Sequence, residues 1–208
     1  MSAPDHEPSN RPTFTFIQVV IAALACLLLG VGVGRVWTNR GEGPSSVDVG
    51  FVRDMIDHHD QAIAISLVTL AKDDINQLVR DFATEVLIFQ RWEIGLMDAR
   101  LGEWGAARGD LDRVAMTWMG MGAAVPTMPG MQPPEAIEAL EAASGAEADR
   151  LFLTMMGEHH QGGVHMAEYA AQHGSDDRIV ALAARMAANQ RVEVNEYRAL
   201  LDQLTGPG

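Results

Sequence analysis

The chain has 208 residues, of which 48% are hydrophobic, and its 28 acidic and 15 basic residues give a formal net charge of −13. This length suits one ordinary domain plus a targeting segment, and the acidic balance excludes a nucleic-acid partner and favours cations as ligands. The single cysteine, Cys26, excludes both an intramolecular disulfide and a metal site built from several thiolates.

The first predicted element is a membrane helix near the N-terminus. Residues 14–34 carry no charge and are rich in Val, Leu, Ala and Gly, and about 20 apolar residues suffice to cross a bilayer. Trp37, with an arginine on either side, is typical of a membrane interface. We therefore expect a polar tail at 1–13, a transmembrane signal anchor at 14–37 and a flexible linker at 38–47. Cleavage as a signal peptide is the alternative.

The remaining residues contain an internal repeat. The segment FVRDMIDHHDQAIAIS at 51–66 aligns with FLTMMGEHHQGGVHMA at 152–167, at an offset of 101 residues. Further along each copy, QRWE at 90–93 aligns with QRVE at 190–193, at an offset of 100 residues. Two alignments at nearly one offset indicate a duplicated unit. The domain is therefore predicted to be a doubled helical hairpin.

Capping signals divide the two copies into helices. Ser45-x-x-Asp48 and Ser144-x-x-Glu147 are typical of capping boxes, and Gly174-Ser175 indicates the end of one helix and the start of the next. Asp73 or Asp74 is a candidate cap for the second helix. We predict long helices over 48–71, 74–101, 146–172 and 176–203, and a short helix over 134–143.

The domain organisation follows from these helices. Repeat 1 (48–101) and repeat 2 (146–205) are joined by a Met- and Pro-rich crossover at 102–145, which completes a domain at 48–205. Four helices with one long crossover are typical of ferritin-like bundles. The predicted fold class is therefore all-α, a ferritin-like four-helix bundle formed by two repeated helical hairpins with a long crossover, plus an N-terminal transmembrane helix.

The repeated histidines are predicted to lie on the core face of their helices. At about 100° per residue, one sector of the helix contains Met55, His58 and His59 in the first copy and Met156, His159 and His160 in the second. His165 falls on the opposite, solvent side. Ala62 and Gly163 are small residues beside the pairs, which leaves room for an ion or for a close helix approach.

Carboxylates on the partner helices are predicted to face these histidines. One stripe carries Gln90, Glu93 and Met97 with Val86 in repeat 1, and Gln190, Glu193 and Tyr197 with Met186 in repeat 2. A carboxylate in a core is costly unless it is paired, hydrogen-bonded or metal-bound. Glu93 and Glu193 are therefore expected either to ligate a metal or to accept an imidazole N–H. A polar network without metal is the alternative, and the duplication favours metal.

The donor types indicate copper. Ferritin-like di-iron sites use Glu-x-x-His, whereas this sequence has Met55-x-x-His58 and Met156-x-x-His159. Thioether with imidazole suits copper, above all Cu(I), better than iron or zinc. The crossover adds five methionines that are either copper contacts or an adaptable apolar flap, namely Met116, Met119, Met121, Met128 and Met131.

These motifs resemble a family known as domain of unknown function 305. Its hallmark is two Met-x-x-His-His helices, each followed by a Gln-x-x-Glu helix, and residues 48–203 match this pattern, including Met-Pro-Gly-Met at 128–131. The resemblance implies a ferritin-like bundle, usually exported, with some members tied to copper binding and tolerance. It therefore implies a single-pass protein of the plasma membrane with its C-terminal domain outside the cytoplasm. Gly162-Gly163 departs from the first copy, so the two sites are expected to differ in affinity.

The sequence thus predicts a membrane-anchored protein that sequesters or relays copper, as Cu(I) or Cu(II), and is not an enzyme. The predicted metal-site residues are His58, His59, His159, His160, Met55, Met156, Glu93 and Glu193. The predicted partners are the metal ion, the membrane through the N-terminal helix, a copper donor or acceptor protein and a second copy of the chain, with no nucleic acid. The alternatives are a ferritin-like metalloenzyme, such as an oxidase or a peroxide-consuming catalyst, and a helical interaction module with structural histidines.

Overall fold

The computed structural model describes residues 43–206, which are predominantly helical. The helices are α2 (Ser46–Leu70), α3 (Gln77–Glu103), α4 (Pro134–Ala142), α5 (Gly145–His173) and α6 (Asp177–Thr205). Two 3-10 turns, Thr117–Met119 and Val125–Thr127, and a ribbon of β1 (Val114–Ala115) paired with β2 (Ala123–Ala124) lie in the crossover. Each of the five helices predicted for the domain is therefore present, with bounds that shift by a few residues.

The transmembrane helix that was included in the predicted fold class is not found among the described helices, and this part of the prediction is wrong. Within residues 43–206, no helix is long and apolar enough to cross a membrane, because the long helices carry charged residues along their exposed faces. The transmembrane anchor predicted at 14–37 lies outside the described residues. The fold is corrected to a predominantly helical bundle, and the location predicted from that anchor, a single pass through the plasma membrane, is withdrawn with it.

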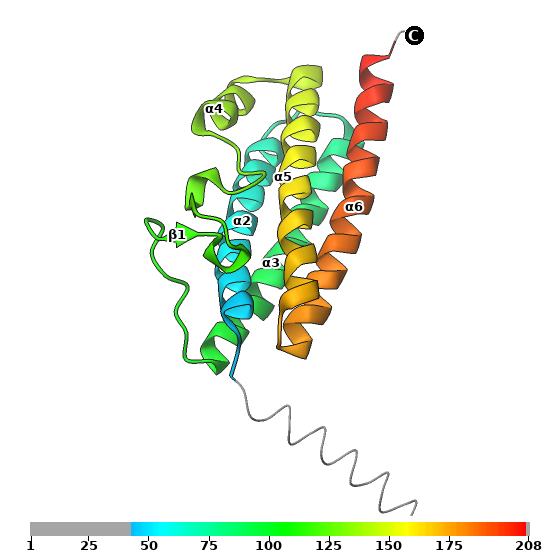
Figure 1. Cartoon of the computed structure of the whole chain (residues 1–208). Helices are drawn as coiled ribbons and strands as arrows, with labels where there is room; N and C mark the ends of the chain where they lie inside the picture. Colours follow the sequence, from blue (N-terminus) through cyan, green and yellow to red (C-terminus); the bar gives the residue numbers. More distant parts are fainter. Residues whose placement is uncertain (1–42, 207–208) are drawn as a thin grey trace, which may run out of the picture. The chain divides into compact units, whose positions relative to one another are not determined.

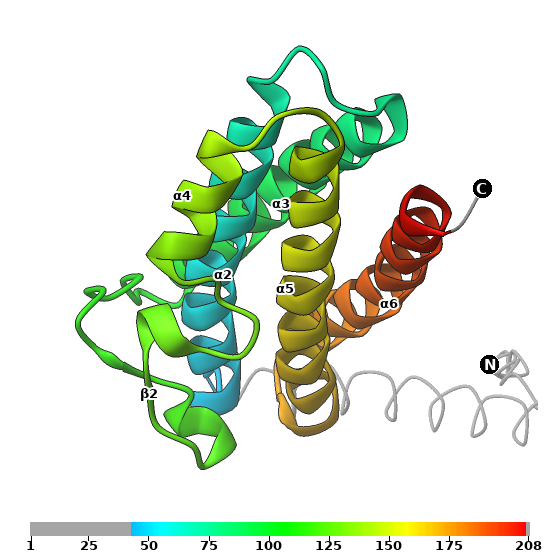
Figure 2. The ribbon, with the colours of Figure 1, turned by 90° about the horizontal axis from the view of Figure 1, so that it is seen from above.

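The four long helices form a bundle with α2 beside α5 at its centre (Figures 1 and 2). Helix α3 packs on α2, and α6 packs on α5, so each predicted hairpin is present. The core has one cluster of buried side chains around Phe51 and Met97 and a second around Phe152 and Tyr197. Since Phe51 corresponds to Phe152 and Met97 to Tyr197, the two core clusters are repeat-related ends of the bundle.

The two repeats are tied together by reciprocal helix caps. Asp48 on α2 accepts hydrogen bonds from the backbone N–H groups of Ser175 and Asp176, at 3.1 and 3.2 Å, where α6 begins. Asp149 on α5, the repeat equivalent of Asp48, accepts from the N–H of Asn76 at 2.9 Å, where α3 begins. Each repeat therefore supplies a carboxylate that accepts hydrogen bonds from backbone N–H groups at a helix start in the other repeat, where such groups lack partners within their own helix.

The predicted capping signals differ in outcome. Ser45 and Asp48 form the predicted capping box at the start of α2. Ser144 begins α5 without a side-chain cap bond. Helices α3 and α6 are capped by Asn76 and Asp176 instead of the predicted residues. The spacing found the helices, but α3 and α6 are capped by local residues other than the predicted ones, and Asp149 and Asp48 add acceptors from the other repeat.

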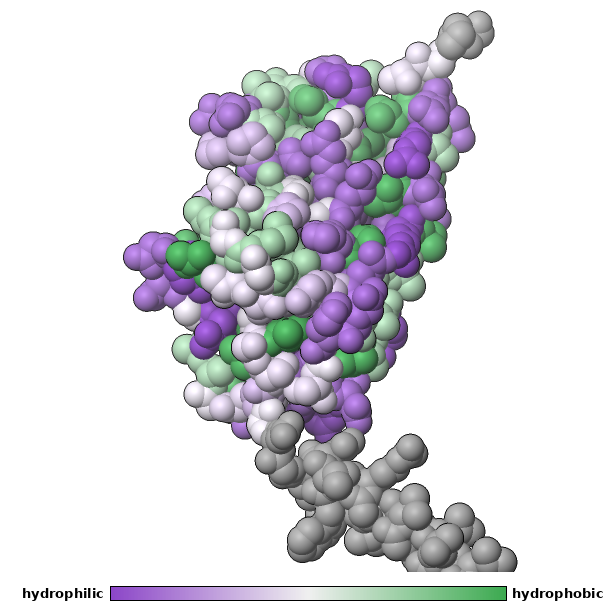
Figure 3. Space-filling model, viewed as in Figure 1, coloured by the Kyte–Doolittle hydropathy of each residue, from purple (hydrophilic) through white to green (hydrophobic). Residues whose placement is uncertain are grey.

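The crossover is fastened to α2 by a buried carboxylate. Asp54 accepts hydrogen bonds from the backbone N–H of Met116 at 2.8 Å and from Trp118 Nε1 at 2.7 Å, and it pairs with Arg113. The indole lies directly on Gly50, where an added Cβ would be 2.4 Å from the ring. Figure 3 shows weakly polar and apolar side chains over this part of the molecule, beside the hydrophilic faces of α5 and α6. The crossover is thus a packed cover over α2.

Replacing Asp48 with alanine tests the reciprocal cap. The variant leaves the Ser175 and Asp176 N–H groups without their acceptor, so the free energy of unfolding should fall by about 2–4 kcal/mol. Urea unfolding of the 208-residue chain, followed by helical circular dichroism, measures the change. Glu138→Ala, at an exposed position of α4, should change stability by no more than about 0.5 kcal/mol. An Asp48→Ala loss as small as this control would contradict the capping role.

Candidate metal centre

Four fully buried histidines lie on the two central helices. His58 and His59 are on α2, His159 and His160 are on α5, and each has a relative exposure of 0%. Their helical register directs both pairs inward, as the periodicity predicts, whereas His165 is exposed. Burial of four imidazoles at one level of a core is costly unless their polar atoms are used.

The first histidines of the two pairs meet at the interface of the repeats. The ring centroids of His58 and His159 are 3.7 Å apart with an interplanar angle of 35°, and the His159 and His160 centroids are 6.1 Å apart. The sequence suggested two separate sites, one for each repeat. The structure instead brings the two predicted sites together into one four-histidine cluster between α2 and α5.

The second histidines of the two pairs contact the predicted carboxylates. His59 Nε2 is 2.9 Å from Glu93 Oε2, and His160 Nε2 is 2.8 Å from Glu193 Oε2. Glu93 comes from α3 and Glu193 from α6, so the pairing expected from the Gln-x-x-Glu stripes is present in both repeats. The Glu193 side chain is 26% exposed and that of Glu93 is 11% exposed. The carboxylates therefore connect buried imidazoles to the outside of the bundle.

The hydrogen bonds assign a proton to one nitrogen of His58. Its Nε2 is 3.1 Å from the carbonyl oxygen of Pro129, which can only accept, so Nε2 carries the proton and the neutral ring has its lone pair on Nδ1. Nε2 of His59 likewise donates to the Glu93 carboxylate. Neither Nδ1 atom has a hydrogen-bond partner in the described part of the chain. Imidazole ligands of metals commonly have this arrangement, with the second nitrogen held by an oxygen acceptor.

Burial keeps the central pair of imidazoles neutral. Loss of solvation, with repulsion from His59 and His160, lowers the pKa of His58 to about 3. Burial, with repulsion from His58 and His160, also lowers the pKa of His159 well below its usual range. Both rings are therefore unprotonated at neutral pH and have lone pairs available to a cation.

These shifted pKa values predict acid sensitivity of the metal-free chain. The unfolded histidines take up protons below about pH 6.5, while His58 and His159 stay neutral in the folded state. The free energy of unfolding should therefore be highest above that pH. As the pH falls below it, the free energy of unfolding should decline by up to about 1.4 kcal/mol per pH unit for each of the two rings. Urea unfolding at about pH 7.5 and pH 5 measures the difference.

The matched variants are His58→Gln/His159→Gln and His165→Gln/His173→Gln. The first should weaken the pH dependence of stability, and the second, at two exposed positions, should leave it unchanged. Equal stability of the parent chain at the two pH values would contradict the neutral, buried state of the central pair.

A tight loop of the crossover closes over the central pair, and sequence reasoning did not place it there. Besides the Pro129 carbonyl on His58, Gly130 has a φ of +86° and lies so close to α5 that an added Cβ would be 2.5 Å from the His159 carbonyl oxygen. A Cβ on Gly162 would lie 2.0 Å from the Pro129 carbonyl oxygen. The two glycines thus allow loop and helix to touch beside the histidines. The available signals were the Met-Pro-Gly-Met motif and the glycine pair of α5.

Two glutamines hold the same loop on α2. The backbone N–H of Gln132 donates to Gln61 Oε1 at 2.7 Å, and Gln61 Nε2 donates to the Gln132 carbonyl at 2.8 Å. Gln61 lies about one helical turn beyond His58, so this two-bond clamp fixes the loop at the level of the cluster. The segment 129–132, named here the histidine lid, is a built part of the site.

Substitution of Gly162 by alanine tests the lid. The new methyl group displaces the Pro129 carbonyl, so stability should fall by about 1–3 kcal/mol, and the His58 hydrogen bond should be lost. Gly157→Ala, on the same helix and with nothing within 4 Å of the added Cβ, should stabilise the chain by about 0.5–1 kcal/mol. Urea unfolding and the imidazole N–H signals in NMR measure the two effects. The same change in both variants would contradict the lid.

Gly163, the small residue predicted beside the histidines of repeat 2, allows α6 to approach α5 closely. An added Cβ on Gly163 would lie 2.2 Å from Gln190 Oε1, so the glutamine side chain of α6 rests against the α5 backbone. Its counterpart Gln90 is also buried, and the Oε1 atoms of both have no hydrogen-bond partner in residues 43–206. The Gln-x-x-Glu stripes therefore bring further unpaired polar atoms to the histidine level.

The methionines divide between the core and the surface. Met55 and Met156 are fully buried one turn before the histidines of their helices. In the crossover, Met116 and Met128 are buried and Met121 is 45% exposed, so the flap expected there packs on the bundle. Within the described residues, no three His, Cys, Asp or Glu side chains are grouped so that they could hold one ion. Sulfur is thus the further donor available inside the core.

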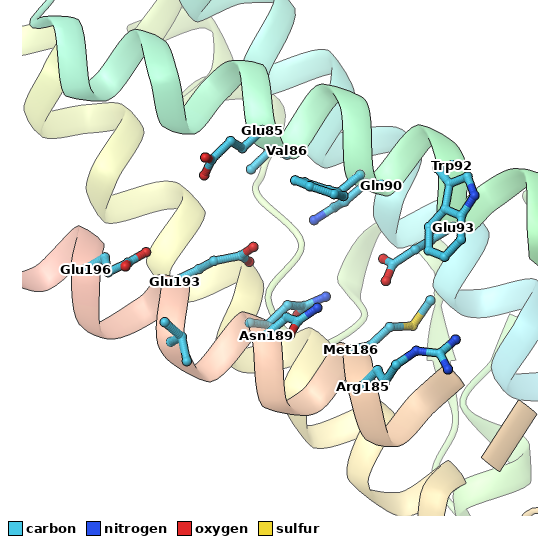
Figure 4. A pocket seen from close by; sticks show the side chains of 13 residues that line it. Glu85, Val86, Gln90, Trp92, Glu93, Arg185, Met186, Asn189, Glu193 and Glu196 are labelled. Carbon is cyan, nitrogen blue, oxygen red and sulfur yellow. The ribbon is translucent and has the colours of Figure 1, made fainter. Parts of the chain in front are cut away.

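A groove between α3 and α6 leads to the carboxylates. It has a volume of about 490 Å³, and Glu93, Gln90, Gln190 and Glu193 are among its lining residues. Figure 4 shows Val86 and Glu93 on α3 facing Met186, Asn189 and Glu193 on α6 across it. The histidines are closed off by the lid on one side and are approached through Glu93 and Glu193 on the other.

Fold and site together define a two-repeat helical bundle with a buried core of four imidazoles and two carboxylates at the junction of the repeats. The chain belongs to the DUF305 family (domain of unknown function), whose sequence profile matches residues 48–201. The resemblance seen in the sequence is thereby confirmed.

Solved structures agree with this assignment. A DUF305 protein from Streptomyces coelicolor is 34% identical, with a TM-score of 0.71 over 76% of this chain and 94% of that one. A DUF305 fragment from Deinococcus radiodurans is 26% identical, with a TM-score of 0.67 over 78% and 99%. CopM in its Cu(I)-bound form has the same fold at 21% identity, with a TM-score of 0.57 over 76% and 98%. No curated protein matches the chain in sequence.

Proposed function

We propose that the chain binds copper ions at the four-histidine cluster and stores them or passes them on. The observation that carries this proposal is the set of buried imidazole nitrogens without hydrogen-bond partners, together with the burial that keeps the rings of His58 and His159 neutral. A purely structural histidine core would be expected to satisfy these atoms by hydrogen bonds. Here the oxygen acceptors hold Nε2 of His58 and His59 and leave Nδ1 for a cation.

Copper is favoured over iron and zinc by the types of donor. Thioethers of Met55 and Met156 accompany the imidazoles, and the cluster contains only the carboxylates Glu93 and Glu193, which are fewer than a di-iron site of the ferritin type uses. Soft sulfur with imidazole suits copper, above all Cu(I). The likeness to CopM, which has been solved in Cu(I)-bound and Cu(II)-bound forms, supports the same choice.

Storage or relay is favoured over catalysis by the access to the site. The histidine lid closes the cluster on one side, and the groove between α3 and α6 is the open approach, lined by Glu93 and Glu193. The acidic groove attracts a cation, and each carboxylate contacts one histidine. An ion can thus be passed from carboxylate to imidazole, either from solution or from a donor protein that docks at the groove.

Metal titration of the 208-residue chain tests the proposal. Anaerobic Cu(I) and aerobic Cu(II) are each titrated against a competing chelator, and bound metal is counted by mass spectrometry. We expect tight copper binding that is lost in the His58→Ala/His59→Ala/His159→Ala/His160→Ala variant. The His165→Ala/His173→Ala variant, with both substitutions at exposed positions, should bind like the parent chain.

The remaining outcomes contradict the proposal in different ways. Tight iron binding without copper binding would indicate a metalloenzyme of the ferritin type. Absence of all metal binding in a folded chain would indicate an interaction module with structural histidines. Equal loss of copper in the exposed-histidine control would place the ion on the surface and not in the cluster.

A further inference from the structure

The two halves of the cluster, one at His59 and the other at His160, differ in the residues that surround the histidines. At corresponding positions, Met97 of α3 is matched by Tyr197 of α6, and Met186 of α6 is matched by Val86 of α3. Of these three pairs of corresponding positions, one has the same residue in both halves, namely Met55 on α2 and Met156 on α5. One half therefore has three thioethers where the other has a thioether, a phenol and an isopropyl group.

The three thioethers belong to the core cluster at the end of the bundle next to His59. Met55, Met97 and Met186 have exposures of 0%, 0% and 1% and belong to the same core cluster. Met55 is one turn before His59 on α2, and Met97 is one turn beyond Glu93 on α3. Since Glu93 and His59 are in contact, both methionines lie one turn from that contact.

The third thioether reaches the same place from the opposite helix. Met186 and Glu93 line the groove together, and Figure 4 shows their side chains extending toward each other from α6 and α3. In the other half, Val86 occupies the corresponding position of α3 across from Glu193. The groove therefore offers sulfur beside one carboxylate and hydrocarbon beside the other.

The residue of repeat 2 that corresponds to Met97 is Tyr197, and it lies against a histidine. Tyr197 contacts the imidazole of His160, with ring centroids 5.5 Å apart, and also packs on Phe152. By the repeat relation, Met97 corresponds to Tyr197, His59 to His160 and Phe51 to Phe152, so we expect Met97 to lie beside His59. Phe51 and Met97 share one core cluster, as Phe152 and Tyr197 share the other, which agrees with the repeat relation.

Core filling alone does not account for this distribution. Methionine is a flexible filler of irregular gaps, and such a role would place it at both ends of a repeated core. Among the buried methionines, the cluster at the His59 end contains four from the bundle helices and two from the crossover, whereas the cluster at the His160 end contains two, both from α5. No three His, Cys, Asp or Glu side chains are grouped for one ion within residues 43–206, so thioethers are the additional soft donors that this core offers to Cu(I).

We infer that the two halves of the cluster bind copper unequally, and that the half at His59 is the Cu(I) site, with Met97 and Met186 as specificity-determining donors beside Met55. The half at His160, with Tyr197 and Val86 in their places, holds Cu(I) more weakly. This inference rests on the proposed copper function. Soft thioethers select Cu(I), so loss of the two methionines should weaken Cu(I) binding and leave Cu(II) binding by imidazole and carboxylate intact.

The test compares Met97→Leu/Met186→Leu with Met155→Leu. Leucine conserves volume, so these variants are expected to fold, and Met155 is a buried methionine of the other core cluster. The double variant of the 208-residue chain should lose about tenfold or more in Cu(I) affinity, with Cu(II) affinity unchanged. Sulfur scattering in the X-ray absorption spectrum of chain loaded with one equivalent of Cu(I) should decrease in step. Met155→Leu should change neither.

A reciprocal variant tests the inequality from the other side. Val86→Met/Tyr197→Met places thioethers at the matching positions of the His160 half and should raise the number of tightly bound Cu(I) ions. Unchanged Cu(I) affinity in Met97→Leu/Met186→Leu, while the four-histidine alanine variant loses all copper, would overturn this inference and leave the proposed function standing. Copper binding that survives the loss of all four histidines would overturn both.

Discussion

The structure depends on the burial of four imidazoles at one level of a helical core. A buried imidazole is costly unless it is neutral or paired with a carboxylate and unless at least part of its polar atoms is used. Three oxygen groups lie against them: the Pro129 carbonyl and Glu93 are hydrogen-bonded to His58 and His59, and Glu193 Oε2 is 2.8 Å from His160 Nε2. These groups come from three separate elements, namely the crossover, α3 and α6. The histidines on α2 and α5 therefore require an oxygen group from each of these three elements.

The long crossover is explained by this requirement. A bundle of two hairpins could be joined by a shorter connection, but the cluster would then be open above His58 and His159. Asp54 and Trp118 fasten the first part of the crossover on α2, and Gln61 clamps the histidine lid. Since these bonds are made to α2 within a few turns of His58, the cover and the site have the same rigid support. The groove between α3 and α6 is consequently the open approach.

The helices and the His–Glu partnerships could be predicted from sequence because they follow from local periodicity and from duplication. The repeat doubled every signal and predicted one glutamate for each histidine pair, and the structure places Glu93 beside His59 and Glu193 beside His160. The contact of His58 with His159 and the Pro129 carbonyl could not be predicted, because both join residues about 70–100 positions apart and helical periodicity describes only one helix at a time. The caps at Asn76 and Asp176 are local and were missed because each turn contains several residues that can cap a helix, whereas the additional acceptors Asp149 and Asp48 come from the other repeat.

The location of the cluster at the junction of the repeats has a consequence for how the site is made. His58 belongs to repeat 1 and His159 to repeat 2, and their rings are in contact, so neither hairpin alone contains the centre. The reciprocal caps fix the relative register of the two hairpins from both ends of the bundle. A duplicated hairpin thereby gains a site that a single copy lacks. Because the two halves are separate stretches of one chain, and not identical subunits, each can also carry different residues around the same histidine geometry. Met97 beside His59 and Tyr197 beside His160 are such a difference, and a symmetric dimer of one hairpin could not have it.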